Sequence, residues 1–378
     1  MSKVKLGEVA IEHKETCKGS KDGYRIVGLE HLVSEEVTLT AWDEGSDNTF
    51  TKMFRKGNVL FGRRRAYLKK AAVAPFDGIC SGDITVIEAI PDRILPELLP
   101  FIIQNDDLFD FAVGKSAGSL SPRVKWEHLK NYEFELPDMD KQRELAELLL
   151  AMDATKKSYQ KLIAATDELV KSRFVEMFGD PETNPYGWRK TTVGDVCSSV
   201  VRGPFGSALK KEFFVEPNGS TYKVYEQKHA IQKSATIGTY YISAEKFGEL
   251  RRFECRPGDI LMSCSGTMGE LFQLPSGCER GVINQALCKF TLSDCILPIV
   301  FLTYMRQTIG NLETKGSGIQ NIAAVSYVKA MPINLPPMEI QRRFAAFVAE
   351  VDKSKFELEQ ALSELTATYK RIIAENLG

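Results

Sequence analysis

Two long segments of the chain carry the same heptad pattern. In the first, positions 145, 149, 152, 156, 159, 163, 166 and 170 hold Leu, Leu, Met, Lys, Tyr, Ile, Thr and Val. At the same positions plus 199, the second has Phe344, Val348, Val351, Lys355, Leu358, Leu362, Leu365 and Tyr369. Steps that alternate between four and three give the 3.5-residue period of a coiled-coil seam. The pattern predicts two helices of about 40 residues, each about 60 Å long, that pack against each other.

We expect these two helices to pair in an antiparallel coiled coil. That pairing would place two globular domains at opposite ends of the helices, related by a pseudo-two-fold axis. Both seams have a lysine at the same position, Lys156 and Lys355, and a polar seam residue commonly fixes the register of a coiled coil. The alternative is that each helix packs only on its own domain, but a helix of this length extends beyond a domain of this size.

The duplication extends beyond the helices. Leu136-Pro137 matches Leu335-Pro336, and Gln142-Arg143 matches Gln341-Arg342, both 199 residues apart. Three more pairs of segments align upstream in the same order: 6–9 with 193–196, 55–60 with 256–261, and 118–137 with 317–336. Five matched segments in the same order indicate a repeated structural unit. Each half is therefore predicted to be one mixed domain followed by one long helix.

Prolines and glycines give the boundaries of these parts. Pro137 and Pro336-Pro337 mark the helix starts, because the residue before a proline avoids the α region. Gly179, followed by Pro181, ends the first helix. We predict a first domain at 1–137, a central helix at 138–179, a second domain at 180–336 and a C-terminal helix at 337–378.

The junction "FGDPETNPYGW", residues 178–188, allows two interpretations. Asn184-Pro185-Tyr186 resembles the Asn/Asp-Pro-Pro-Tyr/Phe loop that holds the target amino group in adenine-N6 methyltransferases. The second proline of that loop is missing, and the stretch follows a long helix instead of a buried parallel strand. We therefore interpret it as the hinge between two domains, with Trp188 anchoring the second.

The globular halves are predicted to be α+β. Short β-branched or alternating runs occur at 24–29, 84–88, 223–225, 238–242 and 259–263, separated by turn signals such as "KDG" and "EPNGS". One helix is expected in each half, at 95–113 and 297–314, followed by a Gly/Ser loop. Because strands and helices do not alternate regularly, a parallel nucleotide-binding sheet is not expected.

Positive charge is concentrated in the first half. The whole chain has 49 basic and 50 acidic residues, but 51–70, "TKMFRKGNVLFGRRRAYLKK", has eight basic residues and no acidic one. Such a run binds phosphates through counterion release, and arginine is the commonest reader of guanine. The run therefore favours a nucleic-acid interface over the alternative of a solvated surface strand.

Fourteen residues are predicted to contact DNA. They are cationic or hydrogen-bonding side chains in the basic run, in the Gly/Ser loops and in a milder basic stretch of the second half. Ordinary helix-to-strand turns remain an alternative for the Gly/Ser loops. The set is Arg63, Arg64, Arg65, Lys69, Lys70, Ser121 and Arg123 in the first half, and Arg202, Ser207, Lys210, Lys211, Lys228, Gln320 and Asn321 in the second.

Motifs for chemistry within the chain are missing. Gly114-Lys115-Ser116 is only the tail of a phosphate-binding P-loop, because Phe109 stands where the first glycine belongs. There is no glycine-rich S-adenosylmethionine loop, and the eight cysteines form no C-x-x-C pair. We predict no catalytic, cofactor-binding or metal-binding residue. No secretory pattern or apolar run of about 18 residues is present, which predicts a cytoplasmic protein.

These features together resemble the specificity (S) subunit of type I restriction–modification systems. "LPDMDKQRELAELLLAMDATKK" and "LPPMEIQRRFAAFVAEVDKSK" are similar to the openings of that family's two spacer helices. "FGDPETNPYGW", "VLFGRRRAYLKK", "GDILMSCSGTMGE" and "VRGPFGSALKK" also resemble family elements, so the similarity covers nearly the whole chain. One departure is that the family's Glu-Gln pair is replaced by Lys141-Gln142 and Ile340-Gln341.

The resemblance implies a non-catalytic chain with two target recognition domains. Each would read one half of an asymmetric, interrupted DNA site, and the helices would set the gap and dock two methyltransferase (M) subunits. S-adenosylmethionine, ATP and Mg would be bound by partners: the M subunits, which methylate adenine N6, and two ATP-dependent restriction (R) subunits. A stand-alone adenine methyltransferase and a DNA-binding scaffold or regulator without a methyltransferase partner remain the alternatives.

Overall fold

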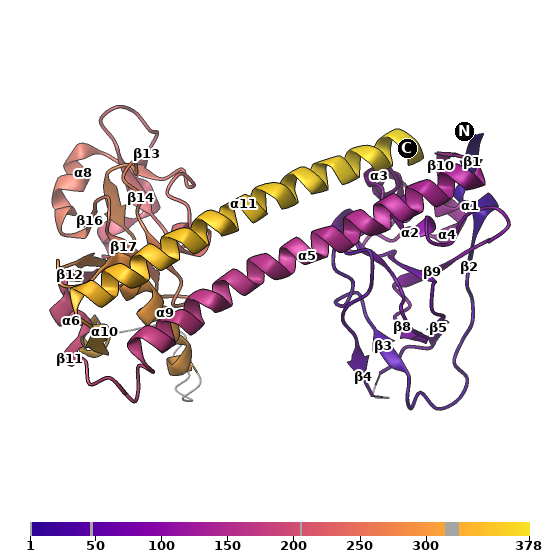
Figure 1. Cartoon of the computed structure of the whole chain (residues 1–378). Helices are drawn as coiled ribbons and strands as arrows, with labels where there is room; N and C mark the ends of the chain where they lie inside the picture. The colour runs from indigo at the N-terminus through magenta and orange to yellow at the C-terminus, as the bar shows by residue number, and fades with distance from the viewer. Residues whose placement is uncertain (1, 46–47, 205, 314–324) are drawn as a thin grey trace. The chain divides into compact units, whose positions relative to one another are not determined.

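The computed structural model describes residues 2–45, 48–204, 206–313 and 325–378, and the chain divides into two compact units (Figure 1). Unit 1 comprises Met1–Ile163 and Phe356–Gly378, and unit 2 comprises Ala164–Lys355. Two helices of 40 residues, α5 (Met139–Phe178) and α11 (Met338–Leu377), each pass from one unit into the other. Each unit therefore holds the start of one long helix and the end of the other.

The described part of unit 1 contains two four-stranded sheets and a strand pair. In the pair, β1 (Ser2–Lys5) is antiparallel to β10 (Glu133–Leu136). The first sheet has the order β2 (Ala10–Glu12), β9 (Ile84–Ala89), β6 (Val59–Gly62), β7 (Ala71–Val73). The second has the order β4 (Asp43–Glu44), β3 (Arg25–Val27), β8 (Gly78–Cys80), β5 (Lys52–Phe54), with β3 and β8 parallel. Its short helices are α1 (Leu6–Val9), η1 (Ala66–Leu68), α2 (Leu99–Ile103), α3 (Asp106–Gly114) and α4 (Trp126–Leu129).

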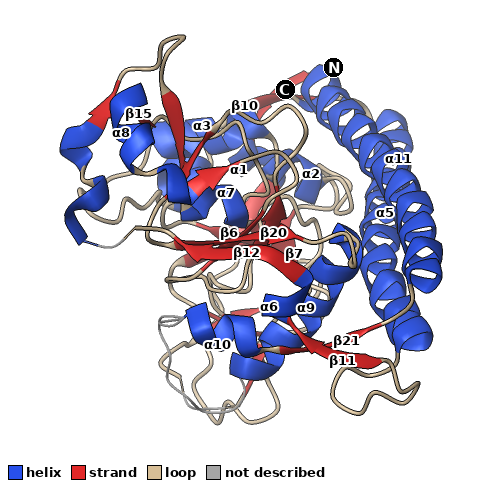
Figure 2. Cartoon of the chain, turned by 90° about the vertical axis from the view of Figure 1, so that its left-hand side faces the viewer, coloured by secondary structure: helices blue, strands red, loops and turns tan. Residues whose placement is uncertain are grey.

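Unit 2 repeats this order. Its strand pair is β11 (Arg189–Thr192) with β21 (Pro332–Leu335) (Figure 2). Its first sheet has the order β12 (Cys197–Arg202), β20 (Leu287–Leu292), β17 (Ile260–Ser263), β18 (Leu271–Gln273). The second adds a strand: β13 (Phe214–Val215), β15 (Tyr241–Ile242), β14 (Tyr222–Tyr225), β19 (Gly281–Ile283), β16 (Glu254–Cys255), with β14 and β19 parallel. Its short helices are α6 (Val193–Val196), η2 (Gly206–Leu209), η3 (Lys211–Phe213), α7 (Gln227–Ile231), α8 (Ala244–Glu249), η4 (Arg251–Phe253), α9 (Pro298–Glu313) and α10 (Val325–Ala330).

The central strand of each first sheet is buried on both faces. In β6, Val59 and Phe61 enter one core cluster and Leu60 enters another. In β17, Ile260 and Met262 face one cluster and Leu261 the other. Successive side chains of a strand point to opposite faces, so a strand covered on both sides must be apolar throughout.

Each unit pairs opposite ends of the two long helices. In unit 1, Leu145 and Leu149 near the start of α5 share a core with Ile373 and Leu377 at the end of α11. In unit 2, Phe174 and Phe178 at the end of α5 pack on Phe344 near the start of α11, with ring centroids 5.5 and 5.1 Å apart. The α+β class and the antiparallel helix pair are therefore confirmed.

A matched glutamine fixes the start of each long helix. The Gln142 carboxamide oxygen accepts the Leu95 amide at 2.8 Å, and its NH₂ donates to the Pro137 carbonyl at 2.9 Å. Gln341 does the same with the Leu297 amide and the Pro336 carbonyl, at 2.9 and 3.0 Å. Both side chains are buried. The repeated Leu-Pro-x-x-x-x-Gln element therefore connects a long helix to the loop that precedes the domain's own helices.

The junction after α5 is a helix cap. The Trp188 indole donates to the Phe178 carbonyl and the Tyr186 hydroxyl to the Glu176 carbonyl, both at 2.9 Å. These are carbonyls of the last helical turn, which lack partners within the helix. Gly179 has φ +80°, and Pro185 lies where a side chain at 179 would project. The junction therefore caps α5, and Trp188 binds the end of that helix. The whole stretch lies within unit 2, so the hinge between two domains stays a prediction.

One predicted helix is interrupted. The sequence predicts a single helix at 95–113, but the segment forms α2 and α3, separated at Gln104 and Asn105. The Asn105 side chain accepts the Asp107 amide at 3.2 Å, as an N-cap does. Its NH₂ also donates to the Leu377 carbonyl at the end of α11. Asn105 therefore begins a second helix at a point where the hydrophobic pattern alone continues.

Candidate nucleic-acid interface

The basic run of unit 1 forms the connection between β6 and β7. Arg65 and Lys69 flank η1 with left-handed backbone angles, φ +54° and +50°. The Arg63 amide donates to the Asp83 carbonyl at 3.0 Å, and the Arg65 amide donates to the Pro122 carbonyl at 2.8 Å. The connection is thus a fixed turn, tied to two loops that lie far from it in the sequence.

Two predicted DNA-contact residues meet at one carboxylate, and a third joins them through Arg64. Asp83 accepts hydrogen bonds from Arg123 at 2.6 Å and from Arg64 at 3.3 Å. Arg64 also donates to the Ser121 hydroxyl at 3.1 Å. The bond from Arg123, together with Arg64, holds the pKa of the Asp83 carboxyl below its ordinary value despite partial burial. The structure therefore assembles Arg64, Ser121 and Arg123 into one hydrogen-bonded group that Asp83 orients.

The basic run contains no acidic residue in the sequence, but in the folded structure carboxylates from other parts of unit 1 lie beside it. Four of its eight cations have carboxylate partners from elsewhere in unit 1. These pairs are Lys52 with Glu12, Arg55 with Glu15 and Asp77, Arg64 with Asp83, and Lys69 with Asp106. Among the described residues, Lys56, Arg63, Arg65 and Lys70 have no ion-pair partner. The Lys70 ammonium instead donates to the Leu29 carbonyl at 2.8 Å. Of the two unpaired arginines of the turn, Arg65 is exposed and Arg63 is half-buried.

The predicted residues of unit 2 are more scattered. Arg202 ends β12 and is buried, with its Nε donating to the Gln285 carbonyl at 3.4 Å, so it supports a loop instead of facing solvent. Lys210, just before η3, and Lys211, its first residue, are exposed. Lys228, in α7, pairs with Glu226 at 2.7 Å. The Ser207 side chain, Gln320 and Asn321 lie outside what the structure describes.

Strand order identifies a segment that the sequence reasoning missed. The counterpart of the β6–β7 turn is the β17–β18 turn, 264–270, which has no lysine or arginine. The Ser263 hydroxyl donates to the Thr267 carbonyl at 2.6 Å, and the side-chain NH₂ of Gln227 donates to the Ser265 and Thr267 carbonyls. Extending the alignment of 55–60 with 256–261 by a few residues would have found this turn.

A second missed repeat joins Tyr24–His31 to Tyr222–His229, 198 residues apart; their sequences are "YRIVGLEH" and "YKVYEQKH". In both, the histidine Nδ1 accepts a backbone amide three residues earlier, at 2.9 Å. Burial lowers the pKa of His229, which keeps that ring neutral near pH 7. The repeated histidine closes the turn after a strand of each second sheet.

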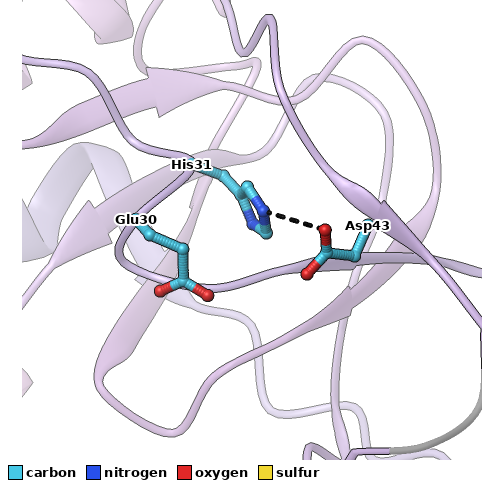
Figure 3. Close-up of side chains that lie close together, drawn as sticks. All are labelled: Glu30, His31 and Asp43. Atoms are coloured by element: carbon cyan, nitrogen blue, oxygen red, sulfur yellow. Dashed lines mark ion pairs between the residues drawn. The ribbon is translucent and has the colours of Figure 1, made fainter. Parts of the chain in front are cut away.

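Around His31, two carboxylates complete a group with the composition of a metal site (Figure 3). The ligand atoms of Glu30, His31 and Asp43 lie within 4.8 Å of one another. However, Nδ1 accepts the Gly28 amide, so Nε2 carries the ring proton and points it toward Asp43 at 3.5 Å. Neither ring nitrogen has a free lone pair for a cation, and the group is better explained as a turn.

None of the helices that the structure describes is long and apolar enough to cross a lipid bilayer. The geometry is that of a duplicated α+β chain with long helices and unlike loops in its two units.

Comparison with known proteins defines the class. The family model described as "Type I restriction modification DNA specificity domain" matches residues 1–165 and 185–366. A putative type I restriction enzyme MjaX specificity subunit from Methanocaldococcus jannaschii is 20% identical over 93% of this chain and 87% of its own length. The type I restriction enzyme EcoDI specificity subunit of Escherichia coli is 23% identical over 45% of this chain and 35% of its own length.

Solved structures share the fold. A chain from a structure that concerns complex assembly and conformational transition of the type I R-M system has a TM-score of 0.62 and 22% identity, covering 99% of this chain and 97% of its own. The type I restriction–modification S subunit from M. genitalium has a TM-score of 0.53 and 13% identity, covering 98% and 94%. Because the family model matches both halves, this chain belongs to the family of type I restriction modification DNA specificity domains.

Proposed function

We propose that this chain is the non-catalytic, sequence-reading subunit of a type I restriction–modification complex, and that each unit reads one half of a bipartite, asymmetric DNA site. The observation that carries this is a framework repeated in both units with different turns on it: 63–70 in unit 1 and 264–270 in unit 2. Phosphate contacts position such a domain, and side chains at base edges specify the sequence. Two unlike turns on one framework suit two unlike half-sites.

The long helices would set the gap between the half-sites and dock two M subunits. Large apolar side chains exposed on both helices support docking, since a partner that covers them removes apolar surface from water. Five large apolar side chains of α5 are 45–51% exposed: Leu148, Leu150, Leu162, Leu169 and Val175. Phe356, in α11, is 58% exposed.

The chemistry is assigned to the partner subunits. Methylation of an adenine within a duplex requires the base to be flipped into a catalytic pocket, which the M subunit would supply together with S-adenosylmethionine. ATP and Mg would be used by R subunits. The chain would bind no cofactor itself, and it would act in the cytoplasm, where chromosomal DNA is accessible.

Co-expression with the cognate M subunit, followed by mapping of methyladenine across the genome, tests this function. We expect one bipartite motif that disappears when this chain is omitted. Co-purification of both subunits with no methylated motif would favour a scaffold, and methylation by the isolated chain would favour an enzyme.

Four residues inserted into each long helix at matched positions add about 6 Å and rotate one end by about 40°, so the required gap should change. An unchanged gap would exclude the helices as its determinant.

A further inference from the structure

Unit 2 has a cavity of about 650 Å³ beside the first turn of α11. Its walls come from η4 and the approach to β17, from the end of β20 and the residues after it, and from Met338 and Arg342 of α11. A volume of this size lies within the range of about 300–1,000 Å³ typical of small-molecule sites. No aromatic ring is among the described residues that line it.

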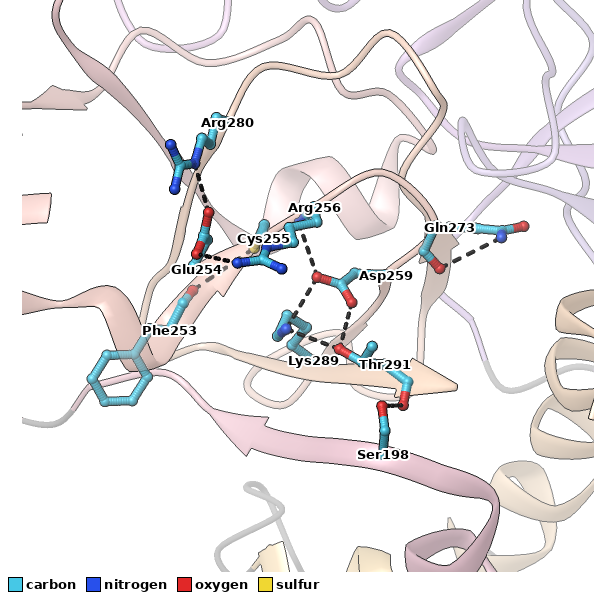
Figure 4. A network of polar contacts seen from close by, with 11 residues as sticks. Ser198, Phe253, Glu254, Cys255, Arg256, Asp259, Gln273, Arg280, Lys289 and Thr291 are labelled. Carbon is cyan, nitrogen blue, oxygen red and sulfur yellow. Dashed lines mark hydrogen bonds and ion pairs between the residues drawn. The ribbon is translucent and has the colours of Figure 1, made fainter. Parts of the chain in front are cut away.

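Cations outnumber carboxylates around this cavity. Five cationic and three anionic side chains line it, and two of the three carboxylates are already paired (Figure 4). Asp259 accepts from the Lys289 ammonium at 3.0 Å, and Glu254 is held by Arg256 at 3.1 Å and by Arg280 at 2.6 Å. The remaining carboxylate of the lining, Asp294, is exposed.

Three of the lining arginines are unpaired. Arg251, Arg252 and Arg342 are exposed, and within the described ranges none has an ion pair or a side-chain hydrogen bond. They come from two separate elements, η4 and α11, yet line one cavity. Three guanidinium groups that repel one another would be stabilised by an anion that accepts hydrogen bonds from all of them.

Unit 1 shows that the fold does not need these charges. Strand register aligns Glu254 of β16 with Met53 of β5, which puts Phe50 and Thr51 in the places of Arg251 and Arg252. The counterpart of Arg342 is Arg143, which is paired with Asp140 at 2.5 Å. The same framework forms in unit 1 with these positions apolar, neutral or paired, so the free arginines of unit 2 serve a purpose other than folding.

We propose that this cavity binds phosphoryl groups, held by Arg251, Arg252 and Arg342. The planar guanidinium fork matches phosphate oxygens in bidentate geometry, and the lack of an aromatic ring means that a phosphate chain is recognised, not a nucleobase. Two sources carry this chemistry: the backbone of a bound DNA duplex and a free polyphosphate. The site lies apart from the β17–β18 turn, since it adjoins the opposite end of β17.

The test uses the full chain with Arg251, Arg252 and Arg342 all changed to Gln, and two probes: inorganic tripolyphosphate and a 30-base-pair duplex. We expect the association constant for tripolyphosphate to fall about a hundredfold, because the variant cannot form the charge-assisted hydrogen bonds of the three guanidinium groups. A matched variant, Arg189→Gln with Lys161→Gln and Lys353→Gln, removes the same charge from exposed positions outside the cavity and should bind tripolyphosphate as the wild type does.

The duplex distinguishes the two sources. If DNA is the source, the plot of the logarithm of the duplex association constant against the logarithm of the salt concentration should be less steep in the cavity variant. The slope should change by about 0.9 for each phosphate that the arginines no longer neutralise. If the source is a free polyphosphate, tripolyphosphate binding should fall while the duplex affinity stays equal to that of the control variant.

Thermal unfolding of the wild-type chain gives a readout that needs no variant. Tripolyphosphate should raise the unfolding midpoint more than sodium chloride of equal ionic strength, since a ligand of the folded state stabilises it. Equal effects of the two salts, or equal probe affinities in the cavity and control variants, would overturn the proposal. So would arginine-dependent capture of an acidic peptide without any phosphate binding.

Discussion

The two units share a framework and differ in where their free positive charge lies. In unit 1, the unpaired arginines Arg63 and Arg65 lie in the turn between β6 and β7, and the place that corresponds to the unit 2 cavity is neutral or paired. In unit 2, the matching turn 264–270 has no cation, and the unpaired arginines line the cavity beside α11. The free charge thus lies at opposite ends of the first sheet in the two units, while the strand order is the same.

This difference separates what the fold requires from what each unit does with it. The elements that repeat are those that satisfy buried polar groups: Gln142 with Gln341, and His31 with His229. A buried backbone group without a hydrogen-bond partner destabilises the fold wherever it occurs, so both units have the same side chain as its partner. Exposed charges are under no such constraint, and they differ between the two units.

The largest expected effect concerns DNA binding by unit 1. Changing Arg63, Arg64 and Arg65 together to Ala should lower the DNA affinity of the complex with its M subunit about a thousandfold, because three cations that neutralise phosphates are removed. Methylation of the site should disappear. In unit 2, Thr267→Ala in the matching turn removes no charge and should leave the salt dependence of binding unchanged. Wild-type methylation by the triple variant would exclude the β6–β7 turn from the interface.

The next effect concerns a buried polar residue that differs between the two units, Asp259 in unit 2 and Asn58 in unit 1. At the approach to β17, Asp259 accepts the Arg256 amide at 2.9 Å; at the approach to β6, Asn58 accepts the Arg55 amide at 2.8 Å. Only unit 2 adds a buried partner, Lys289, where strand register puts Val86 in unit 1. Asp259→Ala should therefore cost about 3 kcal/mol, since it leaves a buried ammonium unpaired.

The double variant Asp259→Asn with Lys289→Val installs the unit 1 pair and serves as the control. It should recover most of the stability that Asp259→Ala removes, as measured by urea unfolding, because no unpaired charge remains. Asn58→Ala in unit 1 should cost only about 1–2 kcal/mol, the effect of one buried hydrogen bond. If Asp259→Ala and Asn58→Ala lower the free energy of unfolding equally, the ion pair with Lys289 adds no stability beyond the hydrogen bond to the turn.

A smaller and equal effect is expected at the two helix starts. Gln142→Ala and Gln341→Ala should each destabilise their unit by about 2 kcal/mol, because buried amide and carbonyl groups lose their partners. Hydrogen exchange of the Leu95 and Leu297 amides would measure this locally. A large change in one unit only would show that the glutamines are not equivalent.

Sequence periodicity predicts the long helices well because the signals are local. The prolines place the helix starts after Pro137 and Pro337, and the helices run Met139–Phe178 and Met338–Leu377. The Asp83 group could not be predicted in this way, because its arginines lie 19 and 40 residues away and meet only through strand pairing. The burial of Arg202 likewise depends on how the loop at Gln285 folds over the end of β12. The DNA-contact residues themselves stay a prediction.

The smallest effect is a pH dependence confined to unit 1. The pKa of Asp83 is held below its ordinary value of 3.8, chiefly by the hydrogen bond from Arg123, so the folded state favours the ionised form. That contribution to stability is complete above the ordinary value and is lost as the pH falls through the lowered pKa of the folded state. Asp83→Asn should therefore reduce the loss of stability that unit 1 shows below about pH 4, and it should leave unit 2 unchanged, since the carboxylate belongs to unit 1.

At neutral pH the same variant releases Arg64 and Arg123 from their counterion, so duplex affinity should rise slightly and with a steeper salt dependence. A fall in affinity instead would mean that Asp83 is needed to hold the two guanidinium groups in place for DNA.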